Sequence, residues 1–226
     1  MITRNAPTAL VNSVLAWCPE VVRSLGLTIV AGGFIRAYFA GEKPSDMDLY
    51  FRNQECFLFF IKELQNSGWK EVANTDRAVT FLKDGKCVQA IRYRFGNPDE
   101  VIGMFDFTIC QASMTVYNTA SLDPEGIDPE NGQGQGKIEG NLWLHENFFE
   151  HLAARVLVFN PKAPMPLASL KRVIKYLKRG YSICDEGLIV LAEAINRTVD
   201  FEDPESVQQA IAGMDPDGQR RIRVID

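Results

Sequence analysis

IVAGGFIRAYFAGEKPSDMDLYF, residues 29–51, is the stretch of this 226-residue sequence that decides the fold. A short apolar, β-branched run over residues 27–31 predicts a buried strand. The glycine pair that follows breaks this strand before residues 34–39, which predict a short helix. After a loop, residues 47–51 predict a second strand. The stretch is therefore predicted to form a strand, a glycine turn, a helix and a second strand. This order fixes where each polar residue lies relative to these elements.

Two aspartates stand at the start of the second strand. Asp46 and Asp48 are two residues apart, and side chains alternate between the faces of a strand, so both carboxylates project to the same side. Two like charges side by side repel, and a divalent cation between them removes that repulsion. Mg²⁺ prefers a few carboxylates together with water and substrate phosphates. We therefore predict that Asp46 and Asp48 are catalytic and bind Mg²⁺, with Mn²⁺ as an alternative ion.

The glycine turn predicts a place for phosphate groups. Gly32 and Gly33 lack side chains at a strand-to-helix junction, which lets phosphate oxygens approach the amide groups at the helix N-terminus. Arg36, in the first turns of that helix, adds a charge-assisted contact. Ser45 offers a hydroxyl to a triphosphate. We predict that these four residues bind the nucleotide.

A third acidic residue stands in Met-Phe-Asp-Phe-Thr, within residues 104–110, whose alternation predicts a core strand. An ionised carboxylate there is costly unless it is paired, hydrogen-bonded or metal-bound. We predict that Asp106 is the third catalytic carboxylate, acting as metal ligand or base. Three carboxylates could hold two ions, one for the attacking oxygen and one for the leaving pyrophosphate. Singly, these features also fit a turn, a solvated pair or a salt bridge; their order favours a functional site.

The remaining sequence divides into a mixed half and a helical half. We expect helices within residues 8–25 and at 56–65, a hairpin of residues 78–82 and 87–95 joined by Asp84-Gly85, and a long loop at 121–140. A helix at 145–154, a strand at 155–159 and helices at 167–179, 184–196 and 204–212 follow. We predict a catalytic domain over residues 1–160 and a helical extension over residues 161–226.

One predicted helix of the second half is basic. Lys171, Lys175 and Lys178 are spaced by four and three residues, which places them on one face of the helix at 167–179. That face either holds the triphosphate or an RNA acceptor, or is an ordinary solvated helix face. We include Lys171 and Lys175 among the predicted nucleotide-binding residues.

Charge and composition exclude several classes of protein. The formal net charge of −5 and the pI of about 5.2 argue against coating duplex nucleic acid through a broadly basic surface. No apolar run approaches the roughly 20 residues of a membrane span, and no signal peptide is recognisable. Five scattered cysteines and two histidines signal neither a disulfide framework nor a zinc site. We expect a cytoplasmic protein without membrane contact, with a hard, oxygen-liganded cation; its oligomeric state stays open.

The residues around the carboxylates resemble a known superfamily. Gly32-Gly33 through Asp46-Met47-Asp48-Leu49 is similar to the signature of the DNA polymerase β-like nucleotidyltransferases, and Gly-Gly-x-x-Arg resembles the head of the bacterial-type CCA-adding enzymes. This resemblance, over about residues 20–115, implies an α+β fold with a mixed, largely antiparallel sheet flanked by helices. It also implies two Mg²⁺ ions on Asp46, Asp48 and Asp106. Ala37 stands where the CCA-adding enzymes carry an aspartate, so the chain looks more like stand-alone phage and bacterial nucleotidyltransferases, toxin-like members included.

The function that follows is Mg²⁺-dependent transfer of a nucleoside monophosphate from an NTP, such as ATP, to an acceptor hydroxyl. Our first hypothesis is an RNA acceptor, such as a tRNA end. The second keeps the chemistry but moves it to a protein hydroxyl or a small molecule, which the acidic pI mildly favours. The third is a catalytically silent nucleotide-binding protein. Acceptor, base preference and number of nucleotides added stay open at this point.

Overall fold

The structure is a computed structural model that describes residues 1–24, 26–121 and 136–214. It divides into two compact units. Unit 1 comprises Met1–Gly103 and Cys110–Glu146, and unit 2 comprises Met104–Ile109 and Asn147–Asp226. Within the described ranges, no helix is both long and apolar enough to cross a membrane.

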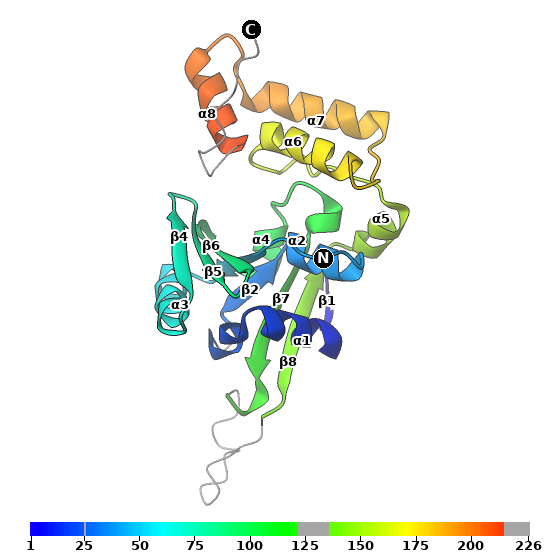
Figure 1. The fold of residues 1–226 in the computed structure, drawn as a ribbon. Helices are drawn as coiled ribbons and strands as arrows, with labels where there is room; N and C mark the ends of the chain where they lie inside the picture. The colour runs from blue at the N-terminus through cyan, green and yellow to red at the C-terminus, as the bar shows by residue number, and fades with distance from the viewer. Residues whose placement is uncertain (25, 122–135, 215–226) are drawn as a thin grey trace, which may run out of the picture. The chain divides into compact units, whose positions relative to one another are not determined.

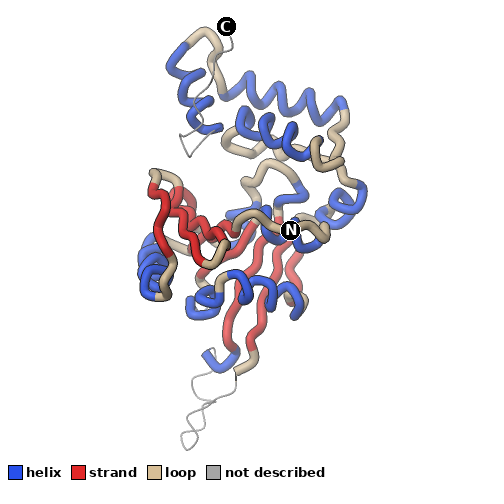
Figure 2. The backbone as a smooth tube through the Cα atoms, viewed as in Figure 1, coloured by secondary structure: helices blue, strands red, loops and turns tan. Residues whose placement is uncertain are grey.

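Unit 1 is built on a mixed sheet (Figures 1 and 2). The part of the chain that the structure describes contributes eight strands: β1 (Ile2–Asn5), β2 (Thr28–Ala31), β3 (Met47–Phe51), β4 (Lys70–Asn74), β5 (Ala78–Lys83), β6 (Lys86–Phe95), β7 (Ala112–Asn118) and β8 (Ile138–Leu144). Their order is β1-β8-β7-β2-β3-β6-β5-β4. Neighbouring described strands are antiparallel except β3 and β6, which are parallel. The predicted α+β class and largely antiparallel sheet are confirmed.

Helices cover the sheet of unit 1 and bury one face of β3. They are α1 (Thr8–Trp17), the 3-10 helix η1 (Pro19–Ser24), α2 (Gly33–Phe39), α3 (Gln54–Asn66) and α4 (Pro98–Ile102). The ring of Phe51 at the end of β3 lies 5.5 Å from that of Phe57 and 5.7 Å from that of Phe60, both on α3. Met47 and Leu49 share this fully buried face of the strand. The residues between them therefore project from the opposite face.

The predicted hairpin is confirmed. β5 and β6 pair antiparallel, and their turn places both Asp84 and Gly85 at positive φ, 49° and 73°. Two-residue hairpin turns need this backbone conformation because it matches the twist of the flanking strands. The strand at residues 47–51 and the helices near 34–39 and 56–65 are also found.

Two predicted strands are wrong. Residues 104–110 form a bend at Asp106 and the 3-10 helix η2 (Thr108–Cys110), and the strand β7 begins only at Ala112. Apolar and polar residues alternate here in sequence, but the side chains do not alternate in burial, since residues 106–110 are all buried. Residues 155–159 form only isolated bridges, after the helix α5 (Phe148–Ala154), whose C-cap residue Arg155 has a left-handed φ of 52°.

The sequence pattern missed four of the described strands: β1 and β4 at the sheet edges, and β7 and β8 inside the sheet. β4 has an almost wholly exposed burial pattern and β1 a mostly exposed one, so neither carries a clear apolar alternation. Of the predicted loop at 121–140, residues 122–135 lie outside the described residues. Ile138 to Gly140 belong to β8.

Unit 2 is mostly helical. It contains α5 (Phe148–Ala154), α6 (Pro166–Leu177), α7 (Asp185–Thr198) and α8 (Pro204–Met214). The ring of Phe107 lies 6.1 Å from Phe159 and 6.0 Å from Tyr176, and Tyr176 lies 5.3 Å from Tyr181. The short segment Met104–Ile109 therefore supplies a core residue to a unit whose other residues follow more than 35 positions later.

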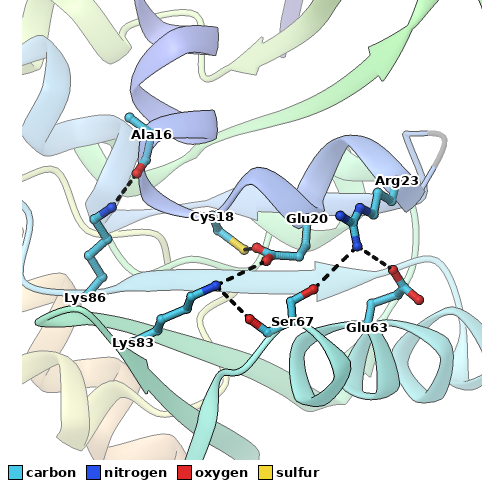
Figure 3. Close-up of polar contacts among 8 residues, drawn as sticks. All are labelled: Ala16, Cys18, Glu20, Arg23, Glu63, Ser67, Lys83 and Lys86. Atoms are coloured by element: carbon cyan, nitrogen blue, oxygen red, sulfur yellow. Dashed lines mark hydrogen bonds and ion pairs between the residues drawn. The ribbon is translucent and has the colours of Figure 1, made fainter.

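Charged side chains tie η1 to its neighbours in unit 1 (Figure 3). The Nζ of Lys83 donates to the carbonyl of Ser67 at 2.7 Å and lies 3.9 Å from the carboxylate of Glu20, which is 3% exposed. Arg23 pairs with Glu63 of α3 at 3.2 Å. Glu20 also contacts a buried thiol, that of Cys18, whose Sγ donates to Glu20 Oε2 at 3.4 Å.

Cys18 should make stability fall at alkaline pH. Burial, and secondarily the charge of Glu20, raise the pKa of the Cys18 thiol far above its ordinary value. The thiol stays protonated in the folded chain but ionises in the unfolded chain above about pH 8.5. Its contribution is therefore fully present below that pH and is lost as pH rises, by about 1.4 kcal/mol per pH unit. Urea unfolding at pH 8 and pH 9.5 tests this; the Cys18→Ala variant should lack the extra slope, and equal slopes would refute it.

Candidate active site

The glycine turn and the two aspartates lie at the same end of the sheet in unit 1. β2 and β3 are antiparallel, and Ala31 at the end of β2 is opposite Asp48 near the start of β3. Opposite residues have Cα atoms about 4.5–5.5 Å apart. Since Gly32 follows Ala31 and Asp46 precedes Asp48 by two residues, the turn and both carboxylates adjoin. The backbone N–H of Gly32 donates to the carbonyl of Ala112 at 2.8 Å, which holds the turn on β7.

The two glycines have different roles. Gly32 has φ 73° and ψ −123°, a conformation that residues with a side chain rarely adopt. Gly33, the first residue of α2, has no such φ, and a Cβ built on it would meet no atom within 4 Å. The backbone conformation at position 32 thus requires glycine. At position 33 the conformation does not, but the absence of a side chain leaves open space beside the backbone.

The carboxylates differ in burial from their neighbours on the strand. Asp46 lies immediately before β3 and Asp48 within it, and both are half-buried, whereas Met47 and Leu49 are fully buried. This alternation puts both aspartates on the face opposite α3. Ser45 Oγ donates to Asp46 Oδ1 at 2.7 Å, so the serine orients this carboxylate. Its predicted contact with a triphosphate stays a prediction.

Arg36 is bound within the protein. It is 3% exposed, and its Nη2 lies 2.9 Å from Glu42 Oε2 in the loop that leads from α2 to β3. This ion pair fixes the course of the loop that precedes Asp46. The structure therefore gives Arg36 a supporting role in the site, while its direct contact with a nucleotide stays a prediction.

A polar residue that the sequence pattern did not single out lies beside Asp48. Gln89 on β6 is in parallel register with Asp48 and is half-buried. Residues in register on neighbouring strands project from the same face, so the Gln89 amide flanks the carboxylate. Only the long-range pairing of β3 with β6 reveals this neighbour, because the two residues are far apart in sequence.

Asp106 belongs to unit 2, whereas Asp46 and Asp48 belong to unit 1. Its side chain is 4% exposed, and Oδ2 accepts from Arg172 Nη1 of α6 at 2.9 Å. Its carbonyl accepts from the backbone N–H of Asn160 at 2.7 Å, and the Asn160 side chain donates to the carbonyl of Phe105 at 2.9 Å. A buried carboxylate needs such partners. The sequence left open whether the Asp106 carboxylate is stabilised by an ion pair, by hydrogen bonds or by a metal ion. The structure shows an ion pair within unit 2.

The basic face of the predicted helix exists on α6 of unit 2. Lys171 and Lys175 are exposed, and Val173 and Tyr176 are buried on the other side. Within either unit, the described residues contain no group of three or more His, Cys, Asp or Glu side chains arranged to hold a metal ion. Metal binding in unit 1 would therefore depend on the aspartate pair.

Comparison of the sequence with known proteins gives a family match. The profile described as "Gabija anti-defense 2 family protein" matches residues 8–155. The protein "Gabija anti-defense 2" of Bacillus phage SPbetaL7 is 30% identical over 156 residues, which are 69% of this chain and 34% of that protein. This chain thus spans about a third of the length of that relative.

Comparison of the fold leads to CCA-adding enzymes. A CCA-adding enzyme in complex with ATP aligns with a TM-score of 0.62 and 16% identity, over 96% of this chain and 51% of that one. The Thermotoga maritima CCA-adding enzyme complexed with tRNA aligns with a TM-score of 0.58 and 17% identity, over 95% of this chain and 51% of that one. At these identities the likeness establishes the fold, and this chain corresponds to about half of each enzyme.

Proposed function

From the premise that this chain belongs to the Gabija anti-defense 2 family and has a fold similar to that of CCA-adding nucleotidyltransferases, we propose that it transfers a nucleoside monophosphate from an NTP to an acceptor hydroxyl. The observation that carries the proposal is the pairing of Ala31 with Asp48, which sets the glycine turn against the aspartate pair. Phosphate-binding backbone and metal-binding carboxylates are the two components that nucleotidyl transfer requires.

The donor set of the aspartate pair fits Mg²⁺. Asp46 and Asp48 offer carboxylate oxygens from one face, and the open space beside Gly33 leaves room for phosphate oxygens. Mg²⁺ in proteins is commonly held by one or two carboxylates together with water and substrate phosphates. When bound, the ion would stabilise the negative charge that develops on the phosphates during transfer.

The chain's own residues would orient the reactants. The backbone at Gly33 would approach the phosphates, Ser45 would hold Asp46 in place, and the Arg36–Glu42 pair would fix the loop between them. In the reaction, the acceptor oxygen forms a bond to the α-phosphorus, the bond to the pyrophosphate oxygen breaks, and the hydroxyl proton leaves to a base. Such in-line displacement relies mainly on positioning and charge stabilisation.

Asp106 enters the proposal as the third carboxylate, as ligand or base. Its ion pair with Arg172 supports a structural role instead, and the two roles predict different behaviour of variants. Exposed Lys171 and Lys175 on α6 would supply positive charge to a triphosphate or to an RNA acceptor.

RNA is the acceptor we propose first, and an anti-defence role in phage is the context that the family name supplies. The alternative is the same chemistry on a protein or small-molecule hydroxyl, since the chain is acidic. The test is incubation with each α-labelled NTP, Mg²⁺ or Mn²⁺ and total cellular RNA, beside the Asp46→Ala/Asp48→Ala variant. Label in RNA only with the unaltered chain supports the proposal, label on protein or a small molecule moves the acceptor, and no label anywhere refutes transfer.

Gly33→Ala should weaken nucleotide binding without weakening the fold. Its backbone conformation accepts a side chain and its surroundings are open, so the free energy of unfolding should change by less than about 0.5 kcal/mol. The methyl group would stand where phosphate oxygens approach, and we expect KM for the NTP to rise about tenfold, equal to about 1.4 kcal/mol. Gly32→Ala is the contrasting variant, because its left-handed backbone should cost about 1–3 kcal/mol of stability. Unchanged KM in Gly33→Ala would count against phosphate binding at the turn.

A further inference from the structure

Unit 1 carries a group of arginine and aromatic side chains that the proposed reaction does not use. We call it the arginine–tyrosine surface, and it consists of Arg77, Arg92, Tyr93, Arg94 and Phe95. Arg77 precedes β5, and the other four residues form the end of β6. No acidic residue occurs between positions 85 and 98, although the chain as a whole has a net charge of −5. Positive charge is therefore concentrated at this place.

Tyr93 lies at the centre of the arginine–tyrosine surface. The guanidinium carbon of Arg77 is 6.0 Å from the centre of the Tyr93 ring, and that of Arg94 is 5.8 Å from it. The backbone N–H of Arg92 donates to the carbonyl of Arg77 at 2.9 Å, which fixes the two segments together. Tyr93 is 48% exposed and Phe95 36% exposed. Cations and ring are thus held side by side at the surface.

The two arginines that β6 contributes to this surface, Arg92 and Arg94, are not neutralised by carboxylates within the described ranges. Among the residues that the structure describes, Arg92 and Arg94 form no ion pair with Asp or Glu. The guanidinium of Arg92 instead lies 5.4 Å from the Phe57 ring. An exposed Asp76 precedes Arg77 in the chain. Arg92 therefore packs on α3 with its Nε buried, and Arg94 is the β6 arginine that lies beside the exposed Tyr93 ring.

We propose that the arginine–tyrosine surface binds a single-stranded nucleic acid, with Arg77 and Arg94 on the phosphates and Tyr93 against a base. Proteins that bind single strands combine a positively charged track with aromatic rings on which bases stack. A duplex buries its bases and would leave the rings without a partner. The surface lies on the strand that carries Gln89, the neighbour of Asp48. Gln89 and Tyr93 are four positions apart on this strand, which corresponds to at most about 13 Å. This binding extends the proposed function but requires neither Asp46 nor Asp48.

Fluorescence anisotropy of a labelled single-stranded RNA, without NTP or metal, tests the proposal on the full chain. Each arginine–phosphate contact contributes about 0.7 to the slope of log affinity against log salt, which is about fivefold in affinity at roughly 0.1 M salt. Arg77→Ala/Arg94→Ala should therefore bind about 25-fold more weakly, with a slope lower by about 1.4. Tyr93→Ala should lose about fivefold or more by losing the stacked base, whereas Tyr93→Phe should bind normally.

Matched variants make each outcome decisive. Arg23→Ala removes one arginine charge that is not part of this surface, at the Glu63 pair (Figure 3), and should bind as the unaltered chain does. If Arg77→Ala/Arg94→Ala fails to fold, Arg77→Lys/Arg94→Lys is measured in its place. It keeps both positive charges and should therefore keep the salt slope of the unaltered chain. Equal loss in Arg23→Ala, an unchanged slope in Arg77→Ala/Arg94→Ala, or equal affinity for polyglutamate would overturn the proposal. Binding that persists in Asp46→Ala/Asp48→Ala, with transfer absent from the unaltered chain, would support this surface while refuting the proposed function.

Discussion

The Asp48→Asn variant is expected to lose nucleotidyl transfer by about 1,000-fold or more while folding normally. The change keeps the shape of the side chain but removes the charge that would hold a metal ion, and the lost charge stabilisation of several kcal/mol corresponds to this factor. Stability should not fall, because the substitution also relieves repulsion from Asp46 on the same face. The measurement is the rate of incorporation of α-labelled NTP, together with urea unfolding.

Asp84→Asn is the matched control for this result. It makes the same charge change at the exposed hairpin turn, where asparagine tolerates the positive φ of 49°. It should transfer nucleotides at the unaltered rate. A merely several-fold loss in Asp48→Asn, or equal losses in both variants, would remove the aspartate pair from the chemistry.

Arg172→Ala is expected to lower the free energy of unfolding by about 2 kcal/mol. Breaking a buried ion pair by removing one partner costs about 3–5 kcal/mol, and we reduce this because the Arg172 side chain is 55% exposed and its charge is screened by solvent. The carboxylate of Asp106 would remain buried with its cation removed. Circular dichroism at 222 nm during urea unfolding is the suitable probe, since unit 2 is mostly helical.

A second substitution separates the two roles of Asp106. Adding Asp106→Asn to Arg172→Ala removes the negative charge that is left buried without a cation. The double variant should therefore regain part of the stability that Arg172→Ala loses. Lys175→Ala, an exposed cation of the same helix, should change stability by less than about 0.5 kcal/mol. If Asp106→Asn alone abolishes transfer without loss of stability, Asp106 is a catalytic carboxylate. If it lowers stability and leaves transfer within about tenfold of the unaltered rate, the ion pair is its role.

Sequence patterns predicted those features that depend on local signals. The apolar residues of 47–51 indicated a strand, and Asp84-Gly85 indicated the hairpin turn. Both the strand and the hairpin occur where they were expected. The α+β class was implied by the resemblance of the glycine turn and the aspartate pair to a known superfamily. The edge strand β4 lacks an apolar face, so pattern alone could not reveal it.

The features that the sequence did not reveal depend on pairing over long distances. Asp106 and Arg172 are 66 residues apart, and the sequence pattern assigned Asp106 to a metal ion or a base without indicating Arg172 as its partner. The segment around Asp106 was mistaken for a strand because its apolar and polar residues alternate in sequence, whereas residues 106–110 are all buried and end in a 3-10 turn. Gln89 became a neighbour of Asp48 only through the parallel register of β3 and β6.

The interleaving of the two units limits how this chain can be divided. Unit 2 includes Met104–Ile109, so a fragment that stops at the end of β8 would carry Phe107 without the rings of Phe159 and Tyr176. It would also carry Asp106 without Arg172. Recombination between the units would separate residues that pack together. The two units should therefore be inherited, expressed and engineered as one piece.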